Sequence, residues 1–152
     1  FFEYLAHRFL FHWEAKSKRA QKIVYTFHGC HHHYPRDTTR LFMPPIPSII
    51  ISGSVFGIMF LIMKYNAFMF FPGFLLGYLL YGSIHYAIHA WNPPFKWMKP
   101  HWRNHHLHHY KDENKGFGVS STLWDHIFGT MFDLKNEKED KEKVKEMMYD
   151  KK

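Results

Sequence analysis

Two long uncharged runs, separated by only three residues, most constrain how this chain can fold. They extend from Pro44 to Met63 and from Ala67 to Ala90, with Lys64, Tyr65 and Asn66 between them. A helix of about 20 residues crosses a hydrocarbon layer of ~30 Å, and each run is that long. The short link predicts a transmembrane helical hairpin. The alternative is a pair of buried helices in a soluble protein, but 152 residues leave little polar mass to cover them.

The positive charges indicate which side of the membrane the rest of the chain occupies. Of 20 Lys and Arg residues, seven precede Met43, one is Lys64 at the hairpin tip, and twelve follow Trp91. Both flanks of a hairpin lie on one side, and the positive-inside rule makes that side cytosolic. The net charge of +7 is thereby explained without a nucleic-acid partner. A single cysteine, Cys30, excludes an internal disulfide and agrees with a reducing compartment.

The remaining segments flank the hairpin. The chain opens at Phe1, without a Met, in an apolar run that ends at Trp13. We interpret this run as the end of a longer transmembrane helix and expect the N-terminal region to be incomplete. A charged, helix-forming segment from 14 to 22 leads into a helix from 23 to 34, which Pro35 ends. Another helix is expected over 101–111, then a glycine-rich loop and short helix over 116–130.

The expected organisation is one membrane domain, residues 1–134, followed by a charged C-terminal tail, residues 135–152. The tail is rich in lysine and glutamate and is typical of a solvated helix or a frayed end. The predicted fold class is therefore an all-α integral membrane protein, with a helical hairpin and a cytosolic helical cap.

Histidine is the unusual residue of this chain, with 14 copies that are bunched rather than scattered. Four groups stand out, and all of them flank or end the hairpin on its predicted cytosolic side. They are His7 and His12; His28, His31 and His32; His85 and His89; and His105, His108 and His109. The other four, His33, His101, His106 and His126, fall outside the repeated pattern and are expected to have structural or supporting roles.

The spacing of these histidines suits metal binding. Residues at i, i+3 and i+4 share one helical face, which applies to the second and fourth groups, and the pair in the third group is spaced i, i+4. His7 and His12 are five residues apart and would diverge on a regular α-helix. Either the helix is locally widened there, as in a π-bulge, or these two side chains bind different metals.

Ten imidazoles exceed what one ion can bind, because tetrahedral and octahedral ions take four to six ligands. Two metals with about five histidines each would use them all, which predicts a dimetal site in the cap. Neutral histidines do not balance the positive charge of the ions, so we expect carboxylates near the histidines that orient the rings and share that charge. Asp125, which lies in an apolar stretch, is the first choice, followed by Asp37, Asp112 and Glu14.

With these motifs the chain resembles the fatty acid 2-hydroxylase branch of the fatty acid hydroxylase/sterol desaturase superfamily. The resemblance runs from about residue 3 to about residue 132. Histidine boxes are shared across that superfamily, whereas two segments are more specific: HGCHHHYPRDTTRLFMPP (28–45) and GFGVSSTLWDHIFGT (116–130). The same ten histidines match the ligand positions of the family.

The resemblance implies an O2-dependent oxidoreductase of the endoplasmic reticulum membrane, with its active site facing the cytosol. Such enzymes use two metal ions, expected to be iron for activity, and zinc can occupy the same sites in purified protein. Electrons arrive from cytochrome b5 and its reductase. The reaction implied is hydroxylation of C2 of a long acyl chain (free fatty acid, acyl-CoA or ceramide) in sphingolipid synthesis. Many relatives carry an N-terminal cytochrome b5 domain and two earlier membrane helices, which this sequence lacks.

The acyl chain is expected to lie along the hairpin and the Phe-rich first segment, with its polar head near Tyr34, Arg40, Gly116 and Gly118. Two rival functions remain at this level. One is a sterol desaturase or methyl oxidase with the same histidine site. The other is a membrane metal transporter or store, although the hairpin interior offers few polar side chains for a metal path.

Overall fold

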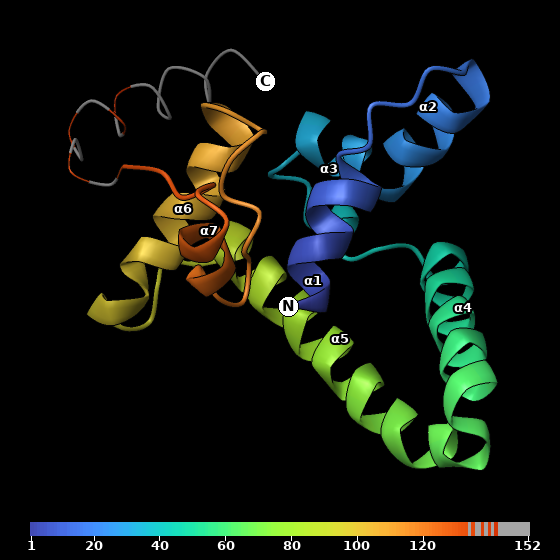
Figure 1. Ribbon diagram of the computed structural model, residues 1–152. Coiled ribbons are helices and arrows are strands. Elements are labelled where there is room, and N and C mark those ends of the chain that lie inside the picture. Colours follow the sequence, from blue (N-terminus) through green and yellow to red (C-terminus); the bar gives the residue numbers. More distant parts are fainter. Residues whose placement is uncertain (134, 136–137, 139, 141, 143–152) are drawn as a thin grey trace.

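The computed structural model describes residues 1–133, 135, 138, 140 and 142, and within them every regular secondary-structure element is a helix. Two regions are evident in Figure 1: a V-shaped helical hairpin, and a cap of shorter helices gathered around one end of it. The predicted all-α class is confirmed. The predicted tail lies largely outside the described residues, and the boundary after residue 134 stays a prediction.

The hairpin consists of α4 (Pro45–Met63), a 3-10 turn (Lys64–Asn66) and α5 (Ala67–Ala90). Lys64 has a φ of 53°, a conformation that breaks the helix and lets the chain reverse. The two helices are joined where Ser48 Oγ lies 2.9 Å from Tyr78 OH. Closer to the tip, the ring centroids of Phe56 and Phe71 are 4.9 Å apart. The helices therefore follow the limits of the two uncharged runs.

The hairpin shows its apolar side chains to the outside. Helical residues between Thr38 and Ala90 form a stretch long and apolar enough to cross a membrane, with a hydropathy of 2.2 and none of its most apolar window buried. Ile62, for example, is 77% exposed and Met69 79% exposed. The alternative of two helices buried in a soluble core is therefore wrong, and these features are those of a membrane protein.

The cap is built from short helices that come from both flanks of the hairpin. The N-terminal flank gives α1 (Phe2–Leu5), the π-helix η1 (Ala6–Phe11), α2 (Lys18–Val24), the π-helix η2 (Tyr25–Gly29), α3 (Cys30–His33) and a 3-10 turn (Thr38–Arg40). The C-terminal flank gives a 3-10 turn (Lys96–Met98), α6 (Lys99–Tyr110) and α7 (Leu123–Ile127).

Local sequence explains where these helices begin and end. Ser17 accepts a hydrogen bond from the backbone N–H of Ala20, so α2 begins at Lys18 and the expected helical start at residue 14 is wrong. At the other end, α3 stops at His33, as predicted, because proline disfavours helical geometry at the residue before it, Tyr34.

The apolar core of the cap is small and lies where α5 meets α6. Ile88 and Trp102 are almost fully buried beside Val119, and Trp102 Nε1 donates to the carbonyl oxygen of Trp91 at 2.8 Å. This bond fixes the end of the hairpin to α6. Much of the remaining interior is occupied by imidazole rings rather than by aliphatic side chains.

Candidate metal centre

The first two histidines lie on a helix with π geometry. η1 covers Ala6–Phe11, and the backbone N–H of His12 bonds the carbonyl oxygen of His7 at 3.1 Å, which is an i to i+5 bond. A π turn brings residues five apart onto one face. The ring centroids of His7 and His12 are consequently 5.0 Å apart. The predicted local widening of the helix is confirmed. His7 and His12 belong to the same histidine group, so the alternative that they bind different metals is not supported.

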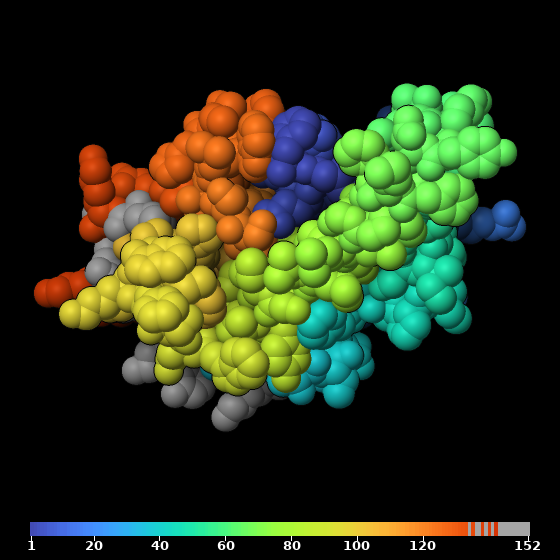
Figure 2. Space-filling view, turned by 90° about the horizontal axis from the view of Figure 1, so that it is seen from below, coloured from blue at the N-terminus to red at the C-terminus, as the bar shows by residue number. Residues whose placement is uncertain are grey.

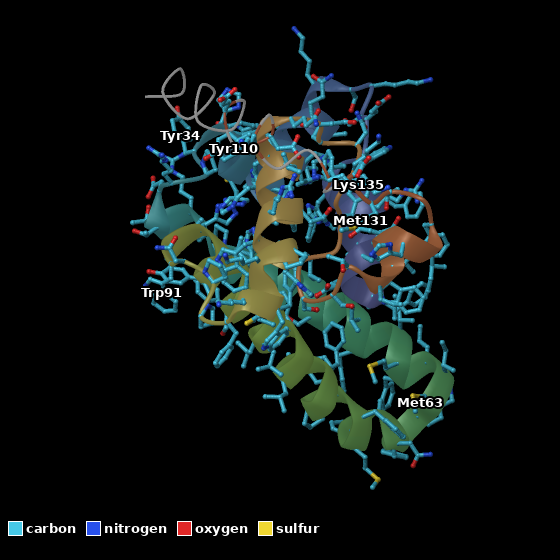
Figure 3. The ribbon with its side chains drawn as sticks, turned by 90° about the vertical axis from the view of Figure 1, so that its left-hand side faces the viewer. Tyr34, Met63, Trp91, Tyr110, Met131 and Lys135 are labelled. Atoms are coloured by element: carbon cyan, nitrogen blue, oxygen red, sulfur yellow. The ribbon has the colours of Figure 1, made fainter. Side chains whose placement is uncertain are left out.

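All ten predicted histidines come together, and they do so as two groups of five. Within each group, one ring nitrogen from each residue lies within 4.8 Å of the others. The first group contains His7, His12, His28, His32 and His108; the second contains His31, His85, His89, His105 and His109. In Figure 3 the cap, whose helices carry most of these histidines, lies above the hairpin, and Met63 is labelled near the far tip of the hairpin. The arrangement can bind two metal ions.

The helices divide their histidines between the two groups. α3 sends His31 to the second group, while its neighbour His32 joins the first. α6 does the same, with His105 and His109 in the second group and His108 in the first. α3 and α6 therefore lie across both groups and hold them next to each other.

The spacing of the nitrogens is that of metal ligands. The Nε2 atoms of His7 and His28 are 2.9 Å apart, and in the second group those of His31 and His109 are 3.0 Å apart. Two ligands at right angles on one metal, with bonds of about 2.1 Å, lie about 3.0 Å apart. Tetrahedral angles would give about 3.4 Å by the same geometry. The observed distances are therefore short enough for the nitrogens of one group to bind a common ion.

Backbone carbonyls determine which nitrogen of three histidines carries the proton. Nδ1 of His7 lies 2.6 Å from the carbonyl oxygen of Phe117, and Nδ1 of His108 lies 2.6 Å from that of Lys115. Nδ1 of His85 is 3.2 Å from the carbonyl oxygen of Leu41. A carbonyl oxygen only accepts, so each Nδ1 is the donor and each Nε2 keeps its lone pair for a metal.

Burial keeps these imidazoles neutral. It lowers the pKa of His7, His28 and His108 well below the usual value, and neighbouring histidines lower it further. The less buried His12 has its pKa lowered to about 4 by the same cause. At neutral pH the rings therefore present lone pairs rather than protons, which is the form that binds a cation.

Asp125 is buried behind the first group and acts on it through the backbone. Its Oδ1 accepts hydrogen bonds from the N–H of Phe117 at 2.9 Å and from Thr130 Oγ1 at 2.8 Å. Its Oδ2 accepts from the N–H of Gly118 at 2.9 Å and from Asn104 Nδ2 at 3.2 Å. Asp125 thus holds the loop whose Phe117 carbonyl orients His7. Burial raises the pKa of Asp125, and these donors oppose that shift.

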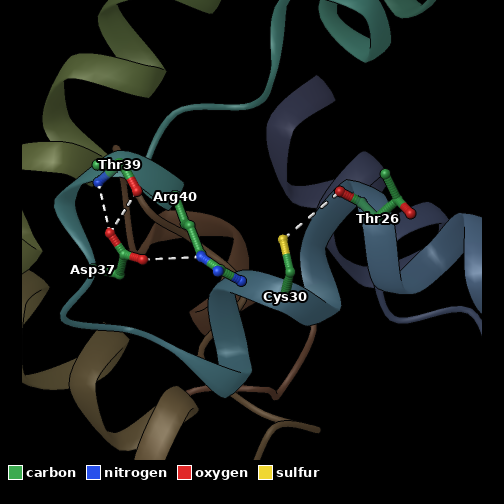
Figure 4. A network of polar contacts seen from close by, with 5 residues as sticks. All are labelled: Thr26, Cys30, Asp37, Thr39 and Arg40. Atoms are coloured by element: carbon green, nitrogen blue, oxygen red, sulfur yellow. Dashed lines mark hydrogen bonds and ion pairs between the residues drawn. The ribbon is translucent and has the colours of Figure 1, made fainter.

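The other predicted carboxylates make local turns. Asp37 accepts hydrogen bonds from the N–H and hydroxyl of Thr39 and pairs with Arg40 at 2.9 Å (Figure 4). Asp112 accepts from the N–H of Asn114, and Glu14 is exposed. Their predicted roles beside the metals stay predictions, and the contacts they make are those of turn-forming residues.

The residues expected near the polar head of a substrate fall into two places. The guanidinium of Arg40 lies 4.5 Å from the ring centroid of Tyr34, at the surface of the cap. Gly116 and Gly118 instead shape the Asp125 loop. Gly116 has a φ of +72°, and a Cβ on Gly118 would lie 2.2 Å from the carbonyl oxygen of Ser121.

Two neighbouring cavities lie beside the hairpin, and one of them reaches the histidines. One, of about 260 Å³, is lined by Phe11, Leu41 and Phe42 and reaches His28 of the first group and His31 and His85 of the second. The other, of about 270 Å³, lies between the start of the chain and the hairpin. The two share Phe11, Tyr78 and Tyr81 in their walls, so the two cavities are adjacent.

Sequence reasoning missed the groups that act through the backbone or at long range. These are the carbonyls of Lys115 and Phe117, the side chains of Asn104 and Thr130, and Glu3, which accepts from the N–H and hydroxyl of Ser120. Only the buried asparagine had a signal, since Asn104 directly precedes a histidine motif on its helix. The four histidines set aside, His33, His101, His106 and His126, lie outside both groups.

This fold and its two histidine groups define a helical membrane protein with a dimetal-type site, and the comparisons place it in a family. The fatty acid hydroxylase family model matches residues 1–130, so the chain belongs to the fatty acid hydroxylase family. It is 38% identical over 135 residues to dihydroceramide fatty acyl 2-hydroxylase FAH2 of Arabidopsis thaliana, covering 88% of this chain and 56% of that protein.

Two further similarities agree. The chain is 41% identical to ceramide very long chain fatty acid hydroxylase SCS7 of Saccharomyces cerevisiae, with 84% of this chain and 34% of that protein covered. A solved structure of full-length scs7p, in which only the hydroxylase domain is visible, superposes with a TM-score of 0.81 at 38% identity, covering 88% of this chain and 52% of that one. The chain thus spans about half or less of the length of these relatives.

Proposed function

We propose that the chain is a dimetal oxygenase that hydroxylates C2 of a long acyl chain carried by a membrane lipid, in sphingolipid synthesis. The observation that carries the proposal is the pair of five-histidine groups at the end of an apolar cavity, in a chain of the fatty acid hydroxylase family. An unactivated C–H bond is beyond side-chain acids and bases, and a redox metal supplies that chemistry when bound.

The ten histidines are proposed as the metal ligands, through Nε2. Two observations support this. Buried Nε2 atoms of His12, His85 and His108 have no hydrogen-bond partner within the described part of the chain. Each of the other seven has its Nε2 about 3 Å from a second Nε2, a distance at which unprotonated lone pairs repel unless a cation lies between them. We expect iron in the active protein and zinc where zinc is available, because imidazole ligands suit both ions and metal availability decides which one occupies the site.

The chain's own residues bind the substrate and exclude water. An acyl chain fits along the cavity between the first helix and α5. Phe2 and Phe74, whose ring centroids are 5.5 Å apart, line this cavity. It then passes Phe11 and Tyr81 to reach the cavity with His28, His31 and His85 at its end. Arg40 also lines that cavity, which suits a polar lipid head. Tyr34 stacks on Arg40 and would assist it.

The proposed setting is the endoplasmic reticulum membrane, with α4 and α5 both spanning it and the cap in the cytosol. The distribution of Lys and Arg supports this orientation, because nearly all of them lie on the cap side of the hairpin. Electrons are proposed to come from cytochrome b5 and its reductase.

The test is product analysis. Membranes containing the protein receive labelled free fatty acid, acyl-CoA or ceramide, together with a reducing system and ¹⁸O2. We expect one ¹⁸O atom at C2 of the acyl chain, and none in a variant with His28 and His31 both changed to alanine. An oxidised sterol, with no 2-hydroxy acyl product, would overturn the proposal.

A further inference from the structure

The underside of the cap carries exposed aromatic and aliphatic side chains beside the hairpin. The segment 91–99, which follows α5 directly, exposes Trp91 (66%), Phe95 (59%) and Trp97 (69%). The rings of Phe95 and Trp97 stack on each other with centroids 6.0 Å apart. Exposed stacked aromatics of this kind are costly in water and are typical of membrane–water interfaces.

This segment is held in place rather than loose. The carbonyl oxygen of Trp91 accepts a hydrogen bond from Trp102, and Met98 packs against the buried cluster that contains Ile88. The backbone is therefore fixed from inside, while Phe95 and Trp97 point outward. Lys96 and Lys99 are exposed in the same segment. Together they make a rigid aromatic surface with two positive charges.

A second exposed apolar face lies on α7. α7 buries Asp125 on its inner side but exposes Leu123 (55%), Ile127 (58%) and the adjoining Phe128 (45%) on its outer side. Leu123 and Ile127 are four residues apart and share one helical face. The helix is amphipathic, because Asp125 on its polar side accepts hydrogen bonds from the loop that contains Phe117 and Gly118.

Contacts between rings place α7 at the level of the hairpin. Trp124 of α7 lies 4.5 Å from Phe1, ring centroid to centroid, and the next residue, Phe2, lies 5.5 Å from Phe74 of α5. Phe74 belongs to the apolar stretch proposed to cross the membrane. Figure 2, seen from below, shows segment 91–99 (yellow) and α7 (orange) on the face from which the green hairpin emerges. In Figure 3, Trp91 likewise lies near the level where the hairpin meets the cap.

We propose that segment 91–99 and the outer face of α7 form a membrane-docking surface that is immersed in the headgroup region beside the hairpin. Its occupant is a lipid bilayer containing anionic phospholipid. The continuity of this surface with the apolar hairpin and the charges of Lys96 and Lys99 support that choice. The inference rests on the proposed membrane insertion of the hairpin, and its effect is to hold the histidine site at a fixed height above the acyl chains.

The test is photolabelling of the unmodified full chain in nanodiscs, with a phosphatidylcholine that carries a diazirine near the top of one acyl chain. Adducts are mapped by mass spectrometry. We expect labelling within 91–98 and at Leu123, Ile127 and Phe128. Ile23 of α2 is the matched control, because it is equally exposed (56%) but lies on the part of the cap remote from the hairpin (Figure 1). It should remain unlabelled.

Three outcomes decide the matter. A labelled hairpin with unlabelled 91–98 and α7 overturns the docking surface and leaves the proposed membrane insertion intact. An unlabelled hairpin contradicts that insertion itself. Equal labelling of Ile23 shows nonspecific lipid contact and overturns the docking surface. With anionic lipid present, Lys96→Glu and Lys99→Glu should each weaken the docking of 91–98 by roughly fivefold, and no effect would overturn the assignment of anionic lipid.

Discussion

His7 and Phe117 are hydrogen-bonded to each other across 110 positions of sequence, with Nδ1 of the imidazole 2.6 Å from the carbonyl oxygen. The bond joins the first helix of the chain to the loop that Asp125 organises. It also determines the tautomer of His7, so that Nε2 faces the other histidines of its group. The orientation of a proposed metal ligand thus depends on a backbone atom, and several expectations follow from that dependence.

Variants that each lack one histidine of a single group should show that the two groups bind metal independently. We expect His7→Ala to reduce the metal content from two ions to one per chain, because the ion of the first group loses a ligand and binds more weakly, while the second group keeps all five histidines. His105→Ala should have the same effect through the other group. Elemental analysis of purified protein measures this. The control is His33→Ala, since His33 is exposed and outside both groups. Loss of both metals in the control would contradict the grouping.

Asp125→Asn should weaken metal binding without removing a ligand. The amide would direct an N–H group at the N–H of Phe117 or Gly118, so the loop would shift and His7 would lose its carbonyl partner. We expect about a 10- to 100-fold loss of metal affinity, measured by competition with a chelator. Asp112→Asn is the matched control, because Asp112 makes a local turn. Equal affinity in both variants would contradict a positioning role for Asp125.

Gly118→Ala tests the tight packing of the same loop. An added Cβ would lie 2.2 Å from the carbonyl oxygen of Ser121 and 2.6 Å from Oδ2 of Asp125, so the backbone has to move. We expect the free energy of unfolding to fall by about 1–3 kcal/mol, as for other overpacked positions. Gly53→Ala in α4 meets nothing within 4 Å and should be neutral or slightly stabilising. Thermal unfolding in detergent compares the two.

The metal-free protein should become less stable in acid, starting below about pH 6.5. Burial lowers the pKa of His28 and His108 in the folded chain, whereas in the unfolded chain they titrate near the usual value of 6.5. Between these values the unfolded state binds more protons, so stability falls as pH decreases. His12, with a pKa of about 4, sets one lower limit of that window. Melting temperatures measured from pH 8 to pH 4 should decline only below 6.5; a flat profile would falsify the neutral buried site.

Asp140 should stabilise the described part of the C-terminal segment. Its carboxylate is buried and lies 2.6 Å from Nη2 of Arg103 on α6 and 2.7 Å from Nζ of Lys111, which directly follows that helix. Burial would raise its pKa, but hydrogen bonds from Lys111 and Arg103 hold that pKa below the ordinary value. We expect Asp140→Ala to lower the free energy of unfolding by about 1–3 kcal/mol. Glu142→Ala, at an exposed position, is the control. Limited proteolysis after residue 133 reports on the difference.

The hairpin and the choice of ten histidines could be predicted from sequence because both signals are local. Charge-free runs and i, i+3, i+4 spacings are read within one segment, and the structure has α4 and α5 within a residue of the expected limits. The assignment of His31 and His32 to different groups could not be predicted. Both project from the same short helix, and which group each joins depends on where α5, α6 and η1 lie.

The backbone carbonyls that bond to the histidines could not be predicted, for a different reason. Any residue type can offer a carbonyl, so Lys115 and Phe117 carry no sequence signal for their bonds to His108 and His7. Asp125 was found because a carboxylate in an apolar stretch is unusual. Its action through the N–H groups of Phe117 and Gly118, rather than on a histidine directly, depends on the fold of the loop.

The way the histidines are shared between distant segments also orders the assembly of the protein. The first group joins His7 to His108, and the hairpin lies between them in the chain. Neither group can close until α6 has left the ribosome, by which time both apolar helices have been synthesised and can already occupy the bilayer. The apolar core of the cap is small, so we expect metal binding to complete the folding of the cap at a late stage. Its effect is comparable to that of a cross-link that closes a long loop. Metal supply during translation should therefore govern the yield of folded protein.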